Sequence, residues 1–225
     1  MPRRSRIVVP GLAHHITQRG NHRNSVFLSD DCRNAYLNDL REYAEKYHVD
    51  IIAYCLMNNH VHLVLVPESP GGLARALAPV HLKVSQRLNR KQKSTGINWQ
   101  GRYFSSPMED AYLCNALNYV HLNPVRAGIV DRPDHYRWSS ARAHLYRKNN
   151  PFLTIKQRWA SHVDNAAGVL IAGSACYEKP EYVAIRDHTK QNTPLGTDEF
   201  IEKLSAQFGR DLRLRSRGKQ PRKHE

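Results

Sequence analysis

Two histidines near the middle of the chain have the spacing of a metal-binding pair. His60, Val61 and His62 begin the apolar run HVHLVLV, which is closed by Pro67 and predicts a β-strand. On a strand, residues two apart point to the same face, so both imidazoles could chelate one divalent cation. By itself the pattern is weak evidence, because two surface or packed histidines can alternate in the same way.

A further ligand and a nucleophile are expected from a helix predicted for Asp110 to about Leu122. Tyr119 and Asn123 are four residues apart and therefore share one face of a helix. The amide oxygen of Asn is a hard ligand, suited to Mg²⁺ or Mn²⁺ in combination with imidazole. A cation beside the tyrosine hydroxyl favours the phenolate and so activates this oxygen as a nucleophile.

This helix allows two other interpretations. Tyr112 is the rival nucleophile, because it lies seven residues before Tyr119 and near the same face. It lacks a polar partner four residues later, where Ala116 stands, so Tyr119 is preferred. A core tyrosine with a satisfied hydroxyl is also very common, and without the two histidines that interpretation of Tyr119 would be favoured.

The elements that must position these residues are predicted from hydrophobic periodicity. Strands are expected at about residues 13–19, 50–57, 60–66 and 99–105, and helices at about 30–48, 71–90 and 110–122. This β-α-β-β-α-β order indicates an α+β fold, an antiparallel sheet with helices packed on it. The chain then divides into a domain of residues 1–146, a mostly helical extension of residues 147–209 and a tail of residues 210–225.

The charge predicts a polyanionic partner. Lys and Arg number 34 against 20 Asp and Glu, so the formal net charge is +14, and the tail alone holds seven Lys or Arg and two acidic residues. Such a chain usually binds nucleic acid, because phosphates attract Lys and Arg and counterions are released. The alternative is a basic surface kept for solubility. The tail is expected to be flexible when free.

The location is expected to be cytoplasmic and associated with the nucleoid. The N-terminus lacks a signal-peptide pattern, and no apolar run approaches the ~20 residues needed to cross a membrane. The four cysteines, at positions 32, 55, 114 and 176, form no Cys-x-x-Cys pair and are expected to be reduced. No membrane partner and no small-molecule cofactor are expected.

Several segments resemble the insertion-sequence-200-like transposases, and more closely the branch of REP-associated tyrosine transposases. They are PGLAHHITQRGN (10–21), AYCLMNNHVHLVLVP (53–67), WQGRYFSSP (99–107), YVHLNPVRAGIV (119–130) and WSSARAH (138–144). The resemblance covers about residues 3 to 146, and several segments agree with the family in their order and spacing. The stretch TPLGTDEFIEKLSAQFGRDLRLRSRGKQPRK (193–223) is also similar to the C-terminal extension of longer members.

The resemblance implies a single-tyrosine HUH endonuclease with a ferredoxin-like, RRM-like core. It implies that His60 and His62 bind the metal, that Tyr119 is the nucleophile and that Asn123 is the polar ligand four residues later. Transposases of mobile elements often have Gln at that last position, whereas Asn agrees with the REP-associated group. The implied reaction is a transesterification in which Tyr119 forms a 5′-phosphotyrosine bond and releases a 3′-hydroxyl, which can later reverse the step.

The implied substrate is an imperfect palindromic DNA hairpin of the REP type, cleaved in its single-stranded flanks. The basic residues expected to grip it are Arg3, Arg4, Arg6, Arg19, Arg23, Lys83, Arg87, Arg102, Arg213, Arg215, Arg217 and Lys219. Trp99 and Tyr103 flank Arg102 and could stack on unpaired bases. A solvated surface charge is the alternative for each basic residue, and core packing is the alternative for Trp99.

Two other functions explain part of the pattern. A DNA- or RNA-binding module without catalysis would account for the charge, but not for the joint presence of His60, His62, Tyr119 and Asn123. A metal-assisted nuclease that uses water would lack the covalent intermediate. Mobile-element relatives dimerise and exchange the tyrosine helix, whereas a monomer acting in cis is favoured here, with a dimer as the alternative.

Overall fold

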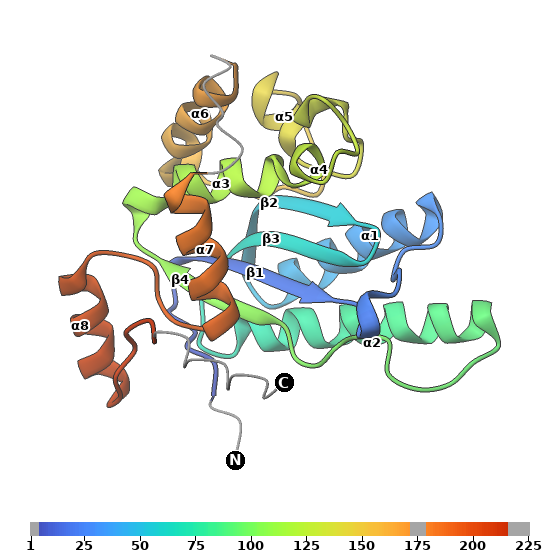
Figure 1. The fold of residues 1–225 in the computed structure, drawn as a ribbon, viewed down its shortest axis with the longest axis horizontal. Helices are drawn as coiled ribbons and strands as arrows, with labels where there is room; N and C mark the ends of the chain where they lie inside the picture. The colour runs from blue at the N-terminus through green and yellow to red at the C-terminus, as the bar shows by residue number, and fades with distance from the viewer. Residues whose placement is uncertain (1–4, 172–178, 216–225) are drawn as a thin grey trace, which may run out of the picture.

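A four-stranded antiparallel sheet forms the centre of the molecule (Figure 1). The computed structural model describes residues 5–171 and 179–215. The strands are β1 (Ala13–Arg19), β2 (Val49–Met57), β3 (His60–Pro67) and β4 (Phe104–Met108), in the order β2-β3-β1-β4. All three strand pairs are antiparallel. With the helices between these strands, the order is that of a ferredoxin-like βαββαβ fold, and the predicted fold class is confirmed.

Helices cover both faces of the sheet. On one face α1 (Asp30–Lys46) and α2 (Gly72–Gln92) pack against each other and against β2. On the other face α3 (Leu113–His121) contacts β2 and β3, and α7 (Pro180–Gln191) contacts β1 and β4 (Figure 1). The residues on this second face of β1 and β3 are therefore enclosed by helices from two distant parts of the chain.

The remaining elements are short or lie toward the C-terminus. They are η1 (Asn21–Arg23), η2 (Asp110–Tyr112), α4 (Asn123–Arg126), η3 (Pro133–His135), α5 (Ala141–Leu145), α6 (Gln157–Ile171) and α8 (Asp198–Phe208). The hydroxyl of Thr197 accepts a hydrogen bond from the backbone N–H of Phe200 and so caps α8. Within residues 5–171 and 179–215, no helix is long and apolar enough to cross a membrane.

The fourth strand begins later than the sequence predicts. Trp99 makes only an isolated bridge to Gly20, and β4 starts at Phe104. The indole of Trp99 is buried instead, and its Nε1 donates to the backbone carbonyl of His81 on α2 at 2.9 Å. Gly101 follows with a φ of 151°, a conformation that breaks an extended run and favours glycine.

The predicted helix over residues 110–122 is divided into three pieces. A 3-10 turn precedes α3, and a further helical turn, α4, continues past the expected end at about Leu122. Pro124 is tolerated because it lies in the first turn of α4, where its missing N–H has no partner to lose. The extra turn brings Arg126 back toward α3.

The segment of residues 147–209 packs closely on the first part of the chain. Helix α6 lies against α3 and α5, whereas α7 lies against the sheet and α3. Leu195 joins the edge of the sheet through two backbone hydrogen bonds, with Pro107 and Glu109. Ile201 and Leu204 of α8 form a small second cluster with the N-terminal segment. The extension therefore forms part of the wall around the enclosed face of the sheet.

Candidate active site

His60 and His62 lie side by side on the enclosed face of β3. Their ring centroids are 4.9 Å apart, with an angle of 76° between the planes. His62 is buried, with 6% of its surface exposed, whereas His60 at the end of the strand is partly exposed. Nδ1 of His60 is hydrogen-bonded to the Asn59 side chain at 2.6 Å. The strand thus presents two imidazoles together, as the alternation of side chains requires.

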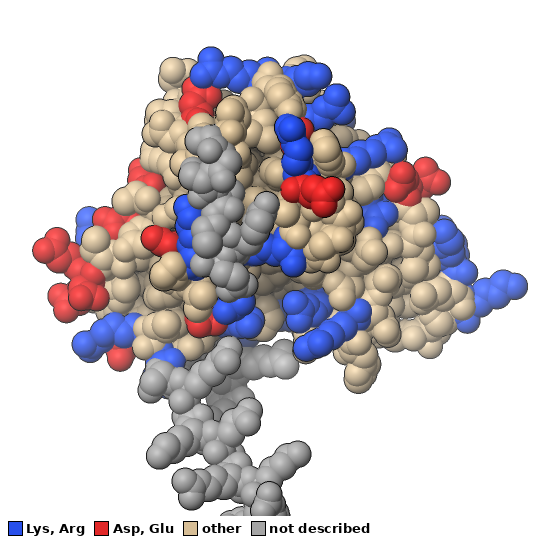
Figure 2. Space-filling view, turned by 45° about the horizontal axis from the view of Figure 1, so that its top comes forward, with Lys and Arg blue, Asp and Glu red and all other residues tan. Residues whose placement is uncertain are grey.

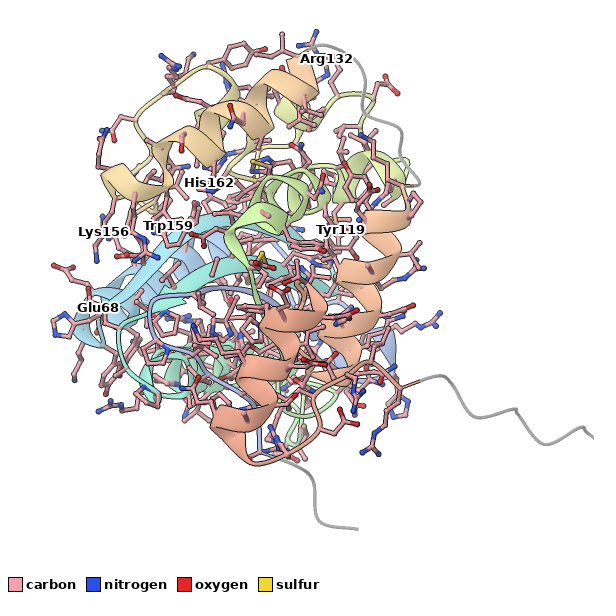
Figure 3. The ribbon with its side chains drawn as sticks, turned by 90° about the vertical axis from the view of Figure 1, so that its left-hand side faces the viewer. Glu68, Tyr119, Arg132, Lys156, Trp159 and His162 are labelled. Atoms are coloured by element: carbon pink, nitrogen blue, oxygen red, sulfur yellow. The ribbon has the colours of Figure 1, made fainter. Side chains whose placement is uncertain are left out.

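Tyr119 reaches this histidine pair from α3. Its ring centroid is 5.6 Å from that of His62, and the rings meet edge to face. Figure 3 shows Tyr119 between α3 and α7, and its ring is 5.8 Å from that of Tyr182 on α7. The candidate nucleophile and one candidate metal ligand therefore come together within a single chain.

Asn123 occupies the junction between α3 and α4. Its Nδ2 donates to the carbonyl of Tyr119 at 2.9 Å and to that of Val120 at 3.3 Å. Its Oδ1 accepts a hydrogen bond from Arg126 at 2.9 Å. A carbonyl oxygen has two lone pairs, so coordination of a metal by Asn123 would use the second one or displace Arg126. Its role as a ligand stays a prediction.

Arg126 is a neighbour of Tyr119 that the sequence interpretation did not select. The centre of its guanidinium group is 4.1 Å from the centroid of the Tyr119 ring and 5.6 Å from that of Tyr182. Its position seven residues after Tyr119 and three after Asn123 is the helical spacing that could have revealed it. Arg126 places a permanent positive charge beside the phenol.

His15 of β1 is a second residue that sequence reasoning missed. Its ring stacks on that of His62, with centroids 5.2 Å apart and an interplanar angle of 13°. Its Nε2 is 3.0 Å from Nδ1 of His62, and its Nδ1 is 2.7 Å from the hydroxyl of Thr189 on α7. His15 stands within the segment of residues 10–21, but nothing in its local spacing points to β3 or to α7.

Burial keeps the imidazoles of the site neutral. It lowers the pKa of His60 to about 4, with the nearby charge of Arg19 as a smaller cause. It lowers the pKa of His15 to about 3, helped by Arg126. The pKa of His62 falls well below 6.5, first through burial and then through His60, His15 and two arginines. Neutral rings have a lone pair available for a metal at neutral pH.

The donor set fits a divalent cation with nitrogen and oxygen ligands. Two neutral imidazoles on one face, together with an amide oxygen, suit Mn²⁺ and accommodate Mg²⁺. In the part of the chain that the structure describes, no three His, Cys, Asp or Glu side chains converge on one point. Further ligands would therefore come from Asn123, water or the oxygen atoms of a substrate.

A basic cavity of about 620 Å³ opens at the end of β1. Arg19, which is paired with His60 across the β1–β3 ladder, lines it together with Arg6, Arg102 and Tyr103. The Arg6 guanidinium lies 3.7 Å from the Tyr103 ring centroid, and its Nε donates to the Tyr103 carbonyl at 2.8 Å. Figure 2 shows Lys and Arg side chains spread from the top to the lower edge of the face it presents.

The start of the tail forms another part of the cavity wall. Arg213 and Arg215 both line it, and the backbone of Arg215 exchanges two hydrogen bonds with the side chain of Gln191. Arg213 forms an ion pair with Asp211 at 3.0 Å. Six of the residues predicted to bind DNA therefore share this cavity, although they come from four separate segments of the chain.

Three other predicted DNA contacts lie elsewhere. Lys83 and Arg87 are on α2, on the opposite face of the sheet, and both form ion pairs with the buried Asp39 of α1. Trp99 is buried against His81 in the core. These three are left out of the DNA surface proposed below, because they are engaged in structural contacts. Arg23 is exposed in η1, and Arg3, Arg4, Arg217 and Lys219 lie outside the described residues.

Comparison with known proteins defines the class. Residues 8–123 match the family described as "Transposase IS200 like", which covers more than half of the chain. The chain belongs to the IS200-like transposase family. The matched range includes His15, His60, His62 and Tyr119 and ends at Asn123, so both Arg126 and the whole of α7 lie beyond it.

Individual relatives narrow the comparison to one branch of this family. A curated protein of Haemophilus influenzae, named as a candidate REP-associated tyrosine transposase, is 27% identical over 157 residues, which cover 60% of this chain and 86% of its own length. A solved structure of a REP-associated tyrosine transposase bound to a REP hairpin aligns with a TM-score of 0.51 and 16% identity. It covers 70% of this chain and 93% of the other, and shows that the two share a fold.

A crystal structure of a candidate transposase from Deinococcus radiodurans is also similar. It is 21% identical, with a TM-score of 0.38, and covers 53% of this chain and 95% of the other. The assignment to the family rests on the sequence match over residues 8–123, and the fold comparison rests on the hairpin-bound structure.

Proposed function

We propose that this chain is a metal-dependent endonuclease and strand transferase for single-stranded DNA. It recognises REP-type palindromic hairpins and cleaves the flanking single strand through a 5′-phosphotyrosine intermediate. The observation that carries the proposal is the placement of Tyr119 against His62, beside His60, within one chain of an IS200-like transposase. The names of the relatives support the choice of substrate.

The chemistry is divided among five side chains. His60 and His62, with Asn123, would hold Mg²⁺ or Mn²⁺, which would polarise the scissile phosphate and neutralise its charge. The Tyr119 oxygen attacks phosphorus and gives its proton to water. The bond from phosphorus to the 3′ oxygen breaks, and the leaving oxygen takes up a proton to become a 3′-hydroxyl. Arg126 remains over the Tyr119 ring and contributes positive charge where the anion develops.

The basic cavity provides the path for the strand. It begins at Arg19 beside His60 and continues past Arg102, Arg6 and Tyr103 to the start of the tail. Arginines bind the phosphates along such a groove, and an aromatic ring such as Tyr103 offers a face to an unpaired base. The tail of residues 210–225 is proposed to extend the contact to the hairpin.

A cleavage experiment tests the proposal against both alternatives. A single-stranded oligonucleotide that carries a hairpin and a 3′-end label is incubated with Mn²⁺ and resolved on a denaturing gel. The wild-type chain is expected to form a labelled covalent adduct, and Tyr119→Phe to form none. Tyr112→Phe, which removes the rival tyrosine, should keep it. Cleavage without an adduct would instead indicate a water-using nuclease, and binding without cleavage a DNA-binding module.

We also propose that the chain acts in cis as a monomer. Tyr119 already faces His62 of the same chain, so no exchange of α3 between subunits is needed to complete the site. A mixture of Tyr119→Phe and His62→Ala variants should therefore form no adduct, because neither chain holds a complete site. Recovery of activity on mixing would show that the nucleophile and the metal ligands come from different subunits.

A further inference from the structure

Three consecutive hydrogen bonds connect His62 to the helix α7. Nδ1 of His62 lies 3.0 Å from Nε2 of His15, and Nδ1 of His15 lies 2.7 Å from the Thr189 hydroxyl. This hydroxyl donates to the backbone carbonyl of Ile185 one turn earlier, at 2.7 Å. His15 and Thr189 are each only 1% exposed, and His62 is 6% exposed, so water does not compete for these groups.

The carbonyl of Ile185 fixes the direction of donation along these three hydrogen bonds. The carbonyl of Ile185 can only accept, so the single proton of the Thr189 hydroxyl is committed to it. Thr189 then accepts from His15, which places the one ring proton of neutral His15 on Nδ1. The Nε2 atom of His15 is left as an acceptor, and it receives the Nδ1 proton of His62.

This order leaves a free lone pair on Nε2 of His62. Nδ1 of a neutral imidazole and Nε2 cannot both carry the proton, so the ring is fixed in the tautomer whose Nε2 can bind a metal. The opposite order, in which Thr189 donates to His15, would place a proton on Nε2 of His62 and prevent coordination through that atom. The identity of the acceptor at Ile185 therefore decides the protonation state of the His62 ring, three hydrogen bonds away.

We propose that Thr189 is a positioning residue of the metal site, acting through His15 to fix the tautomer and orientation of His62. The inference rests on the proposed function, because it takes His60 and His62 as the metal ligands. It assigns a role to the segment of residues 147–209, which lies outside the range of the family match and for which the sequence indicates none. Partners that hold the second nitrogen of a ligating histidine are a general feature of metal sites.

Two substitutions of Thr189 test the role of the hydroxyl and the role of the side-chain shape separately. Thr189→Val keeps the branched shape and removes the hydroxyl, whereas Thr189→Ser keeps the hydroxyl. Ser205→Ala is the matched control, because the Ser205 hydroxyl makes the same bond to a carbonyl one turn earlier, to Ile201 at 2.7 Å, on α8. His62→Ala defines the loss of a ligand itself. Each full-length variant is first compared with the wild type by thermal unfolding.

The first measurement is Mn²⁺ affinity by calorimetry in the absence of DNA. Thr189→Val is expected to weaken binding by about tenfold, the lower end of the effect of removing an outer partner of a metal ligand. Thr189→Ser and Ser205→Ala should bind as the wild type does. Wild-type affinity in Thr189→Val, with His62→Ala impaired, would overturn the inference while leaving the proposed metal site intact. If the wild type and His62→Ala bound Mn²⁺ equally weakly, the proposed metal site itself would be contradicted.

The second measurement needs no substitution. In the metal-free wild-type protein at neutral pH, long-range ¹H–¹⁵N NMR spectra of the ring nitrogens report where each imidazole proton lies. The proposal expects His62 and His15 each to be protonated on Nδ1 and not on Nε2, with Thr189→Val giving a mixture of tautomers for both. A wild-type His62 protonated on Nε2 would contradict the hydrogen-bond order, whatever the metal affinity.

Discussion

At the residue scale, the least expected member of the site is Arg126. It links the two residues that the sequence identified on this helix, because it bonds to the Asn123 amide and covers the Tyr119 ring. A guanidinium group fixed in this position would favour negative charge on the Tyr119 oxygen, the proposed nucleophile, and on a bound phosphate. It also orients Asn123, whose amide oxygen is the proposed third ligand.

Replacement of Arg126 by Ala should therefore slow catalysis more than it weakens binding. We expect the rate of adduct formation to fall by about 10²-fold, the order found when one stabilising donor is removed from an active site. Hairpin affinity in the absence of metal should change little. Arg132→Ala is the control, since Arg132 is exposed and paired with Asp134 (Figure 3). An unchanged single-turnover rate in Arg126→Ala would exclude Arg126 from the chemistry.

At the scale of the elements, the sequence predicts what short-range patterns encode. The alternation of apolar residues located β1 and the β2–β3 hairpin closely, and helical spacing located α1, α2 and α3. The same alternation placed His60 and His62 on one face. The α3–α4 junction was predicted less well, because a proline stops a helix in one position and is accepted in the first turn of the next.

Contacts between distant elements were beyond the reach of sequence patterns. His15 and Thr189 are separated by 174 positions, and they meet only because α7 returns to the face of β1. No periodicity or local motif reports such a meeting. Sequence patterns do not report the basic cavity either, because its arginines belong to the N-terminal segment, β1, the loop before β4 and the tail.

The position of Trp99 against α2 decides between its two expected roles. The sequence left base stacking and core packing open, and the structure places the indole against α2 with its N–H satisfied. Trp99→Ala should lower the free energy of unfolding by about 3–5 kcal/mol, as measured by denaturant titration, because a large buried ring leaves a cavity. Ile97→Ala, at a side chain that is 79% exposed, should cost little. Weaker DNA binding by Trp99→Ala with unchanged stability would instead indicate that Trp99 stacks on a base.

At the scale of the whole molecule, buried histidines predict how stability depends on pH. Burial lowers the pKa of His14 to about 4, of His81 to about 3 and of His144 to about 4. The unfolded chain takes up these protons near pH 6.5 and the folded chain does not, so stability is complete above pH 6.5 and falls as the pH drops toward 4.

Each such histidine should lower the free energy of unfolding by about 1.4 kcal/mol per pH unit below 6.5. Guanidinium titrations at pH 7.5 and 5.0, with EDTA present, measure the effect. In His81→Phe, the loss of unfolding free energy between the two pH values should be smaller by the contribution of one histidine. Equal stability of the wild type at the two pH values would refute the expectation.

The central claim is that Tyr119 carries the covalent bond to DNA, and peptide mapping of the trapped adduct tests it most directly. Trypsin releases residues 103–126 as one peptide that contains Tyr103, Tyr112 and Tyr119, so fragment ions must assign the modified residue. After nuclease digestion, the account predicts a nucleotide phosphate on Tyr119 alone. A phosphate on Tyr112 or Tyr103, or cleaved DNA with no modified peptide, would contradict it.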